Sequence, residues 1–189
     1  LNGCADKIKK FCKVFNIKNI FDINCKYYEF SKKLMEFNEI YAGYNHHPIE
    51  YCFDTATFPR IDYSTLKKEI DIGYSGVVSN QPLCSTAIRS SLLSNVEKIC
   101  AENNFSCKIL KNKRFKDIEE YHKIMLKTKI WIDTITEGGH ISARLWEIPL
   151  HKVAVMVVED PIYCNILEDG INSIIIKKDL LNLEEKLLF

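Results

Sequence analysis

Residues 137–147 hold the densest set of side chains that could bind an anion. Two adjacent glycines precede a stretch with helical spacing, and the free amides at a helix N-terminus attract negative charge. Ser142 and Arg144 lie in the first turns of this predicted helix, where a hydroxyl and a guanidinium can reach phosphate oxygens. Glu147 follows one turn after Arg144, and its carboxylate suits a two-pronged contact with a ribose diol.

Each of these candidates also has a simpler explanation. Arg144 and Glu147 are three residues apart, so they could form only a surface ion pair on the helix. His140 could bind a metal, but no second His or Cys lies nearby at ligand spacing, and we predict no metal site. Gly76 follows a predicted strand, where it either lets the backbone approach a ligand closely or only turns the chain.

The overall composition limits the classes of protein to consider. The chain has 189 residues, 47% hydrophobic and 27% charged, which is typical of a folded domain and excludes disorder, collagen and a coiled coil. A net charge of +1 gives no reason to expect a nucleic-acid partner. The longest apolar stretch is far shorter than the ~20 residues of a membrane span, and no secretion signal is visible. We therefore expect a cytoplasmic protein.

The eight cysteines do not indicate a metal site or a redox motif. They lie at positions 4, 12, 25, 52, 84, 100, 107 and 164, and no pair has C-x-x-C spacing. Several of them fall within apolar helix or strand patterns. We predict that they are reduced and mostly buried thiols.

Hydrophobic spacing predicts alternating helices and strands. The predicted helices are residues 5–16, 27–37, 85–103, 117–127, 140–148 and 180–188, with Pro149 ending the fifth of them. The predicted strands are residues 18–23, 39–44, 69–74, 105–110, 129–134, 152–158 and 172–176, and residues 45–68 read as a linker. This alternation predicts a doubly wound parallel α/β sheet, with any ligand bound beyond the carboxyl ends of the strands.

Four segments in this order resemble the C-terminal, nucleotide-sugar-binding domain of GT-B-fold glycosyltransferases. They are residues 71–76 with the following helix that carries Arg89, residues 119–132, residues 142–147 and residues 168–174. The resemblance is closest to the group-1, family 4-like enzymes and their CgeB-like branch, and it covers residues 45–189. In the family 4 pattern seven residues separate two glutamates. If Glu147 is the second of them, Gly139 stands at the first position, and the CgeB-like branch also tends to lack this first glutamate.

The resemblance implies a fold, a function and a set of site residues. Residues 1–60 would be the end of an N-terminal acceptor-side domain with its linker, and residues 61–189 a Rossmann-like C-terminal domain that binds the nucleotide sugar. The implied reaction transfers a sugar from a nucleotide-diphosphate sugar to an unknown acceptor, such as a glycan, without a further cofactor. The implied nucleotide site is formed by Gly76, Arg89, His140, Ser142, Arg144 and Glu147. Arg89 and Arg144 would neutralise the departing diphosphate.

Other functions stay open. The chain begins with Leu1 and ends at Phe189 within a helical pattern, so we expect a fragment that could be inactive alone. A nucleotide-binding module without transfer activity is one alternative. A partner-binding domain like a response regulator is another, but it would need an acidic cluster that Asp71 and Asp133 do not clearly form. The sequence predicts no catalytic base, stereochemical outcome or oligomeric state.

Overall fold

The computed structural model describes residues 10, 13–16, 18–23, 45–49, 66–78, 84–113, 115, 117–135 and 141–188. The chain divides into two compact units, Leu1–Cys52 and Phe53–Phe189. Most of the predicted helices at 5–16 and 27–37, and the predicted strand at 39–44, lie outside the described residues. Among the described residues, no helix is both long enough and apolar enough to cross a membrane.

In the first unit, two short strands pair in parallel. Strand β1 (Asn19–Ile23) confirms the strand predicted there, and it pairs in register with β2 (Asn45–Ile49). The prediction that the linker begins at residue 45 was therefore wrong. Pro48 lies within β2, opposite Asp22. Each strand of this two-stranded sheet is an edge strand, where a proline can be accommodated because one side of the backbone needs no partner.

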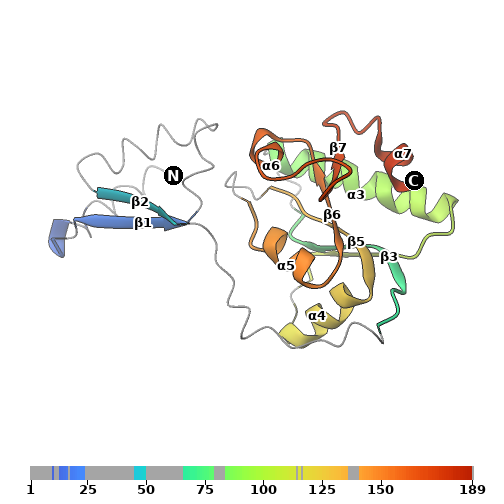
Figure 1. Ribbon diagram of the computed structural model, residues 1–189, viewed down its shortest axis with the longest axis horizontal. Helices are drawn as coiled ribbons and strands as arrows, with labels where there is room; N and C mark the ends of the chain where they lie inside the picture. Colours follow the sequence, from blue (N-terminus) through green and yellow to red (C-terminus); the bar gives the residue numbers. More distant parts are fainter. Residues whose placement is uncertain are drawn as a thin grey trace. The chain divides into compact units, whose positions relative to one another are not determined.

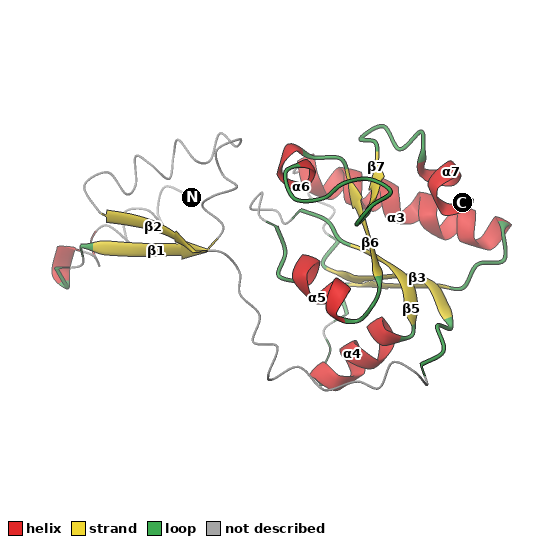
Figure 2. Cartoon of the chain, in the orientation of Figure 1, coloured by secondary structure: helices red, strands yellow, loops and turns green. Residues whose placement is uncertain are grey.

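The second unit is a five-stranded sheet in which all strands are parallel, in the order β4-β3-β5-β6-β7. These strands are β3 (Ile70–Gly76), β4 (Cys107–Lys111), β5 (Thr128–Ile132), β6 (Ala154–Val158) and β7 (Ile174–Ile176). Helices lie on both faces (Figures 1 and 2). The doubly wound, Rossmann-like α/β fold expected from the alternation is confirmed.

The two faces of this sheet carry different helices (Figure 1). Helices α3 (Cys84–Glu102) and α7 (Leu183–Leu188) pack on one face, where their leucines join an apolar core with side chains from β3, β5, β6 and β7. Helices α4 (Ile118–Leu126) and α5 (Arg144–Leu150) lie on the other, and the short α6 (Pro161–Cys164) follows β6. Strand β3 lies between β4 and β5, so the chain leaves it in one direction and leaves β5 in the other. Ligands bind at such a reversal in open α/β sheets.

Helix α5 differs from its prediction at both ends. It begins at Arg144 instead of residue 140, and Ser142 precedes it instead of lying in its first turn. Pro149 lies inside the helix and does not end it at Ile148. The helix ends at Leu150, two residues later than predicted. The amides of His151 and Lys152, which follow it, bond to the carbonyls three residues earlier, at 3.0 and 2.9 Å.

Candidate functional site

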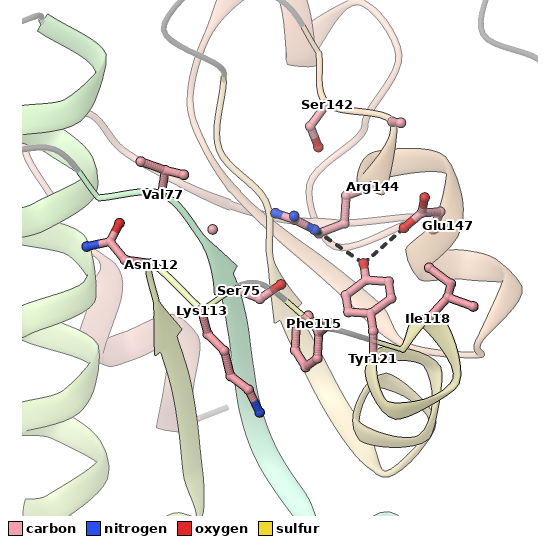
Figure 3. A pocket seen from close by; sticks show the side chains of 12 residues that line it. Ser75, Val77, Asn112, Lys113, Phe115, Ile118, Tyr121, Ser142, Arg144 and Glu147 are labelled. Atoms are coloured by element: carbon pink, nitrogen blue, oxygen red, sulfur yellow. Dashed lines mark hydrogen bonds between the residues drawn. The ribbon is translucent and has the colours of Figure 1, made fainter.

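A pocket of about 870 Å³ opens at the carboxyl ends of β3 and β4, between them and helices α4 and α5 (Figure 3). This volume lies within the usual range for small-molecule sites. The lining residues come from four segments of the second unit: Ser75, Gly76, Val77, Asn112, Lys113, Phe115, Ile118, Tyr121, Ser142, Ala143, Arg144 and Glu147. Four of the six predicted site residues are among them, which are Gly76, Ser142, Arg144 and Glu147.

Arg144 and Glu147 meet at a third residue, not at each other. The Nε of Arg144 donates a hydrogen bond to the Tyr121 hydroxyl at 3.2 Å, and that hydroxyl donates to Oε2 of Glu147 at 2.9 Å (Figure 3). Within the described residues the two side chains form no direct ion pair. The surface ion pair between Arg144 and Glu147, which was considered as an alternative, is thus not formed among the described residues.

The terminal nitrogens of Arg144 face the pocket. No hydrogen bond joins them to any described residue, and Figure 3 shows them turned toward the end of β3. A Cβ on Gly76 would lie 3.6 Å from Nη1 of Arg144 and only 2.6 Å from the Tyr74 hydroxyl. A side chain at position 76 would therefore clash with the Tyr74 hydroxyl, which is a physical reason for glycine at this position, whereas its contact with Arg144 would be an ordinary one.

Ser142 is bonded to a buried carboxylate behind the pocket. Its Oγ donates to Oδ1 of Asp133 at 2.6 Å, and the Tyr163 hydroxyl donates to Oδ2 at 2.9 Å. Asp133 follows β5 and is fully buried, which raises its pKa, although both hydroxyls and the charge of Arg144 lower it. The Ser142 proton is therefore directed at Asp133, and only the lone pairs of its oxygen remain for a ligand.

Arg89 lies behind the pocket and does not line it. Its side chain is 6% exposed, and its two terminal nitrogens donate to the carbonyls of Val77 and Ile135, each at 2.6 Å. It therefore joins the segments that follow β3 and β5. In this geometry both terminal nitrogens of Arg89 already bond to backbone carbonyls, so neither is directed at the pocket. The proposed contact between Arg89 and a diphosphate stays a prediction.

The segment after β3 is also held from the β4 side. The backbone N–H of Asn112 donates to the Gly76 carbonyl at 2.9 Å, and its side-chain amide bonds to both the N–H and the carbonyl of Val78, at 2.8 and 3.2 Å. With Arg89 on Val77, all three carbonyls of residues 76–78 accept hydrogen bonds. This stretch of the pocket wall is fixed before any ligand arrives, which lowers the entropic cost of binding.

One predicted residue, His140, and the glycines before it lie outside the described residues. Among those described, no group of three or more His, Cys, Asp and Glu side chains could hold a metal ion.

Asp71 and Asp133 lie at opposite ends of the sheet's strands. Asp71 is near the start of β3, where it bonds to Lys129 and Ser106 at 2.6 and 2.7 Å, whereas Asp133 follows the end of β5. These two aspartates form no acidic cluster. Cys100, Cys107 and Cys164 carry free thiols, as predicted, but only Cys100 is buried, so the expectation that the thiols are mostly buried does not hold for these three.

Sequence reasoning did not identify Tyr121 and Asp133 as site residues. Tyr121 belongs to the buried face of α4, so its apolar spacing indicates only a core residue. Asp133 carried one signal, because it is a charged residue directly after the apolar strand β5. Nothing local indicates that either of them meets Ser142, Arg144 or Glu147.

A buried histidine lies behind Glu147 and should make stability depend on pH. The His151 ring is fully buried; its Nδ1 donates to the Glu147 carbonyl at 2.8 Å, and its Nε2 lies 2.7 Å from Nδ1 of His122. Nδ1 must carry the hydrogen, so Nε2 accepts from His122 when His151 is neutral. Burial, and to a smaller degree the charges of His122 and Lys68, lower the pKa of His151, against the hydrogen bond to Glu147, which raises it.

We expect the free energy of unfolding to fall as the pH drops from 7.5 to 5.5. The pKa of His151 in the folded protein lies below its usual value of 6.5, so the unfolded chain binds a proton at this histidine more readily than the folded protein does. The contribution of neutral His151 to stability is therefore complete above pH 6.5 and is lost as the pH falls toward the pKa of the folded protein. Urea unfolding at both pH values measures the effect. His151→Gln should be less stable at pH 7.5 but should lose less stability on acidification. An equal loss in both proteins would contradict this role of His151.

Comparison with models of protein families, with curated proteins and with solved structures finds no significant match to this chain.

Proposed function

We propose that this chain carries the nucleotide-sugar site of a GT-B-type glycosyltransferase. The observation that carries the proposal is the guanidinium of Arg144, whose terminal nitrogens face a pocket at the carboxyl ends of parallel strands and have no hydrogen-bond partner among the described residues. A planar guanidinium in this position suits a phosphate group, which can accept two parallel hydrogen bonds from it.

The proposed roles divide the ligand between two side chains. Arg144 binds the diphosphate and stabilises the negative charge that grows as the diphosphate leaves. Glu147 uses Oε2 to accept from Tyr121, so its other oxygen can accept from a ribose hydroxyl. Phe115 and Tyr121, whose ring centroids are 5.3 Å apart, give the pocket an aromatic side on which a flat group can pack.

In the proposed reaction, the bond between the anomeric carbon and the diphosphate oxygen breaks and a bond to an acceptor hydroxyl oxygen forms. The acceptor's proton passes to a base, and the nucleoside diphosphate leaves with the electron pair of the broken bond. Glu147 is the only carboxylate among the described lining residues, and we assign it to the ribose. A base would therefore come from outside this set of residues.

A nucleotide-binding domain without transfer activity is the second candidate. The single carboxylate in the described pocket lining favours it, because no second acid is placed there to activate an acceptor. Both candidates predict nucleoside diphosphate binding. They differ in turnover, since only a transferase releases free nucleoside diphosphate from a nucleotide sugar.

A thermal-denaturation screen with UDP, GDP and ADP tests the binding shared by both candidates. A ligand present at about 100 times its dissociation constant should stabilise the fold by ~2.7 kcal/mol. Nucleotide sugars are then incubated with the chain and a set of glycan acceptors, and the release of nucleoside diphosphate is followed. Binding with release supports a transferase, and binding without release favours the second candidate. No stabilisation by any of the three nucleotides would contradict both.

A further inference from the structure

Arg144 and Glu147 have the spacing at which opposite charges usually pair. They are one turn apart on α5, and such pairs form readily on helices because their side chains lie on the same face. A direct pair here would satisfy both groups internally. It would turn the Arg144 guanidinium away from the pocket and occupy both oxygens of Glu147.

The Tyr121 hydroxyl takes the place of this pair. A hydroxyl can accept and donate at once, and here it accepts from Nε of Arg144 and donates to Oε2 of Glu147, at 3.2 and 2.9 Å. Only the inner nitrogen of Arg144 and one oxygen of Glu147 are used. Among the described residues, no hydrogen bond uses the two terminal nitrogens of Arg144 or the second carboxylate oxygen of Glu147.

Tyr121 is held firmly enough to do this. It lies on the buried face of α4 and is 6% exposed, with its ring at a centroid distance of 5.9 Å and edge-on to that of Trp131, which is fully buried. Burial raises the pKa of Tyr121, so its hydroxyl stays protonated and keeps its hydrogen for Glu147. The spacer between the two charged groups is therefore rigid and always a donor.

We propose that Tyr121 is a positioning residue that keeps Arg144 and Glu147 apart and directs them at different parts of one ligand. This inference rests on the proposed function, in which Arg144 binds the diphosphate and Glu147 the ribose. Without the hydroxyl, the guanidinium swings to Glu147 and forms the i, i+3 ion pair. Removal of the Tyr121 hydroxyl thus weakens phosphate binding, because it turns Arg144 away from the phosphate although Arg144 itself is unchanged.

Four proteins test the proposal: wild type, Tyr121→Phe, Glu147→Gln and the double variant. Their affinities for inorganic pyrophosphate are measured by calorimetric titration. Tyr121→Phe should weaken binding about tenfold in the wild-type background. In the Glu147→Gln background the same change should weaken binding less than about threefold, because a neutral amide does not draw the guanidinium away. A purely structural role for Tyr121 would give the same loss in both backgrounds, and that result, or no loss at all, overturns the proposal.

A crystal structure of the Tyr121→Phe variant tests the same idea without a ligand. It should show the Arg144 guanidinium within ion-pair distance of the Glu147 carboxylate. A guanidinium that still faces the pocket would overturn the positioning role even if the wild type binds nucleotides. Conversely, a wild-type chain that binds neither pyrophosphate nor a nucleoside diphosphate contradicts the proposed function, while an Arg144–Glu147 ion pair in the variant would still establish Tyr121 as their spacer.

Discussion

Replacement of Asp133 by alanine is expected to lower the free energy of unfolding by about 2 to 4 kcal/mol. The carboxylate accepts hydrogen bonds from Ser142 and Tyr163, and Tyr163 is 1% exposed, so its hydroxyl would be left buried without a partner. Each buried polar group left unpaired costs ~1 to 3 kcal/mol, and the small cavity adds to that cost. Burial raises the pKa of Asp133, so removing its charge recovers part of the loss.

Urea unfolding at pH 7 measures this change, and a second background identifies its cause. In Tyr163→Phe the orphaned hydroxyl is absent, so Asp133→Ala should cost clearly less there than in the wild type. Asp133→Asn keeps the volume and one acceptor, so we expect its free energy of unfolding to lie between those of the wild type and the alanine variant. The explanation fails if Asp133→Ala is neutral or costs the same in both backgrounds.

Alanine at position 73 is expected to destabilise the second unit by about 1 to 3 kcal/mol, the usual cost of overpacking a core. Gly73 lies in the middle of β3, and a Cβ there would be 2.5 and 2.7 Å from two carbons of the Trp131 ring and 3.0 Å from Thr128 Cγ2. Trp131 and Thr128 are fully buried, so neither can move aside easily. Any shift of Trp131 would also reach Tyr121, whose ring it touches.

Replacing the indole tests whether this contact causes the loss. In a Trp131→Phe background the smaller ring leaves room for the new methyl group, so Gly73→Ala should cost less than it does in the wild type. Gly170→Ala serves as a comparison, because a Cβ there meets nothing within 4 Å and only the φ of +76° opposes it. Urea unfolding of these variants gives the values. A neutral Gly73→Ala, or a loss that Trp131→Phe does not reduce, would contradict the steric explanation.

The fold could be predicted because its signals are local. The apolar spacing of α3 and the continuous apolar run of β6 lie within single segments, and both elements are found close to their predicted bounds. Strand β2 was missed because Pro48 and its polar neighbours are typical of a loop, whereas pairing with β1 decides the outcome. The start of α5 was misplaced: the Ser142 side chain bonds to Asp133, and only its backbone carbonyl accepts a hydrogen bond from the helix, from the N–H of Leu145.

The site residues likewise fall into those that the local sequence brings together and those that it does not. Ser142, Arg144 and Glu147 are close in sequence, so their types and spacing suffice to place them together. Tyr121 meets Glu147 from 26 residues away, and Tyr163 meets Asp133 from 30. Such contacts depend on how helices pack on the sheet, which no local pattern encodes. Arg89 shows the reverse case: its charge indicates an anion contact, but burial places its terminal nitrogens on backbone carbonyls.

Calorimetric titration of the wild type and Arg144→Lys with UDP and pyrophosphate tests the central claim most directly, with Lys111→Gln as the control. Lys111 pairs with Glu97 on the surface and does not line the pocket, so its loss changes the net charge without altering the site. The wild type and Lys111→Gln should bind both ligands alike, and Arg144→Lys should bind each about tenfold more weakly, because lysine loses the two-pronged contact. Equal affinities of the wild type and Arg144→Lys would contradict the claim that this pocket binds a nucleoside diphosphate through Arg144.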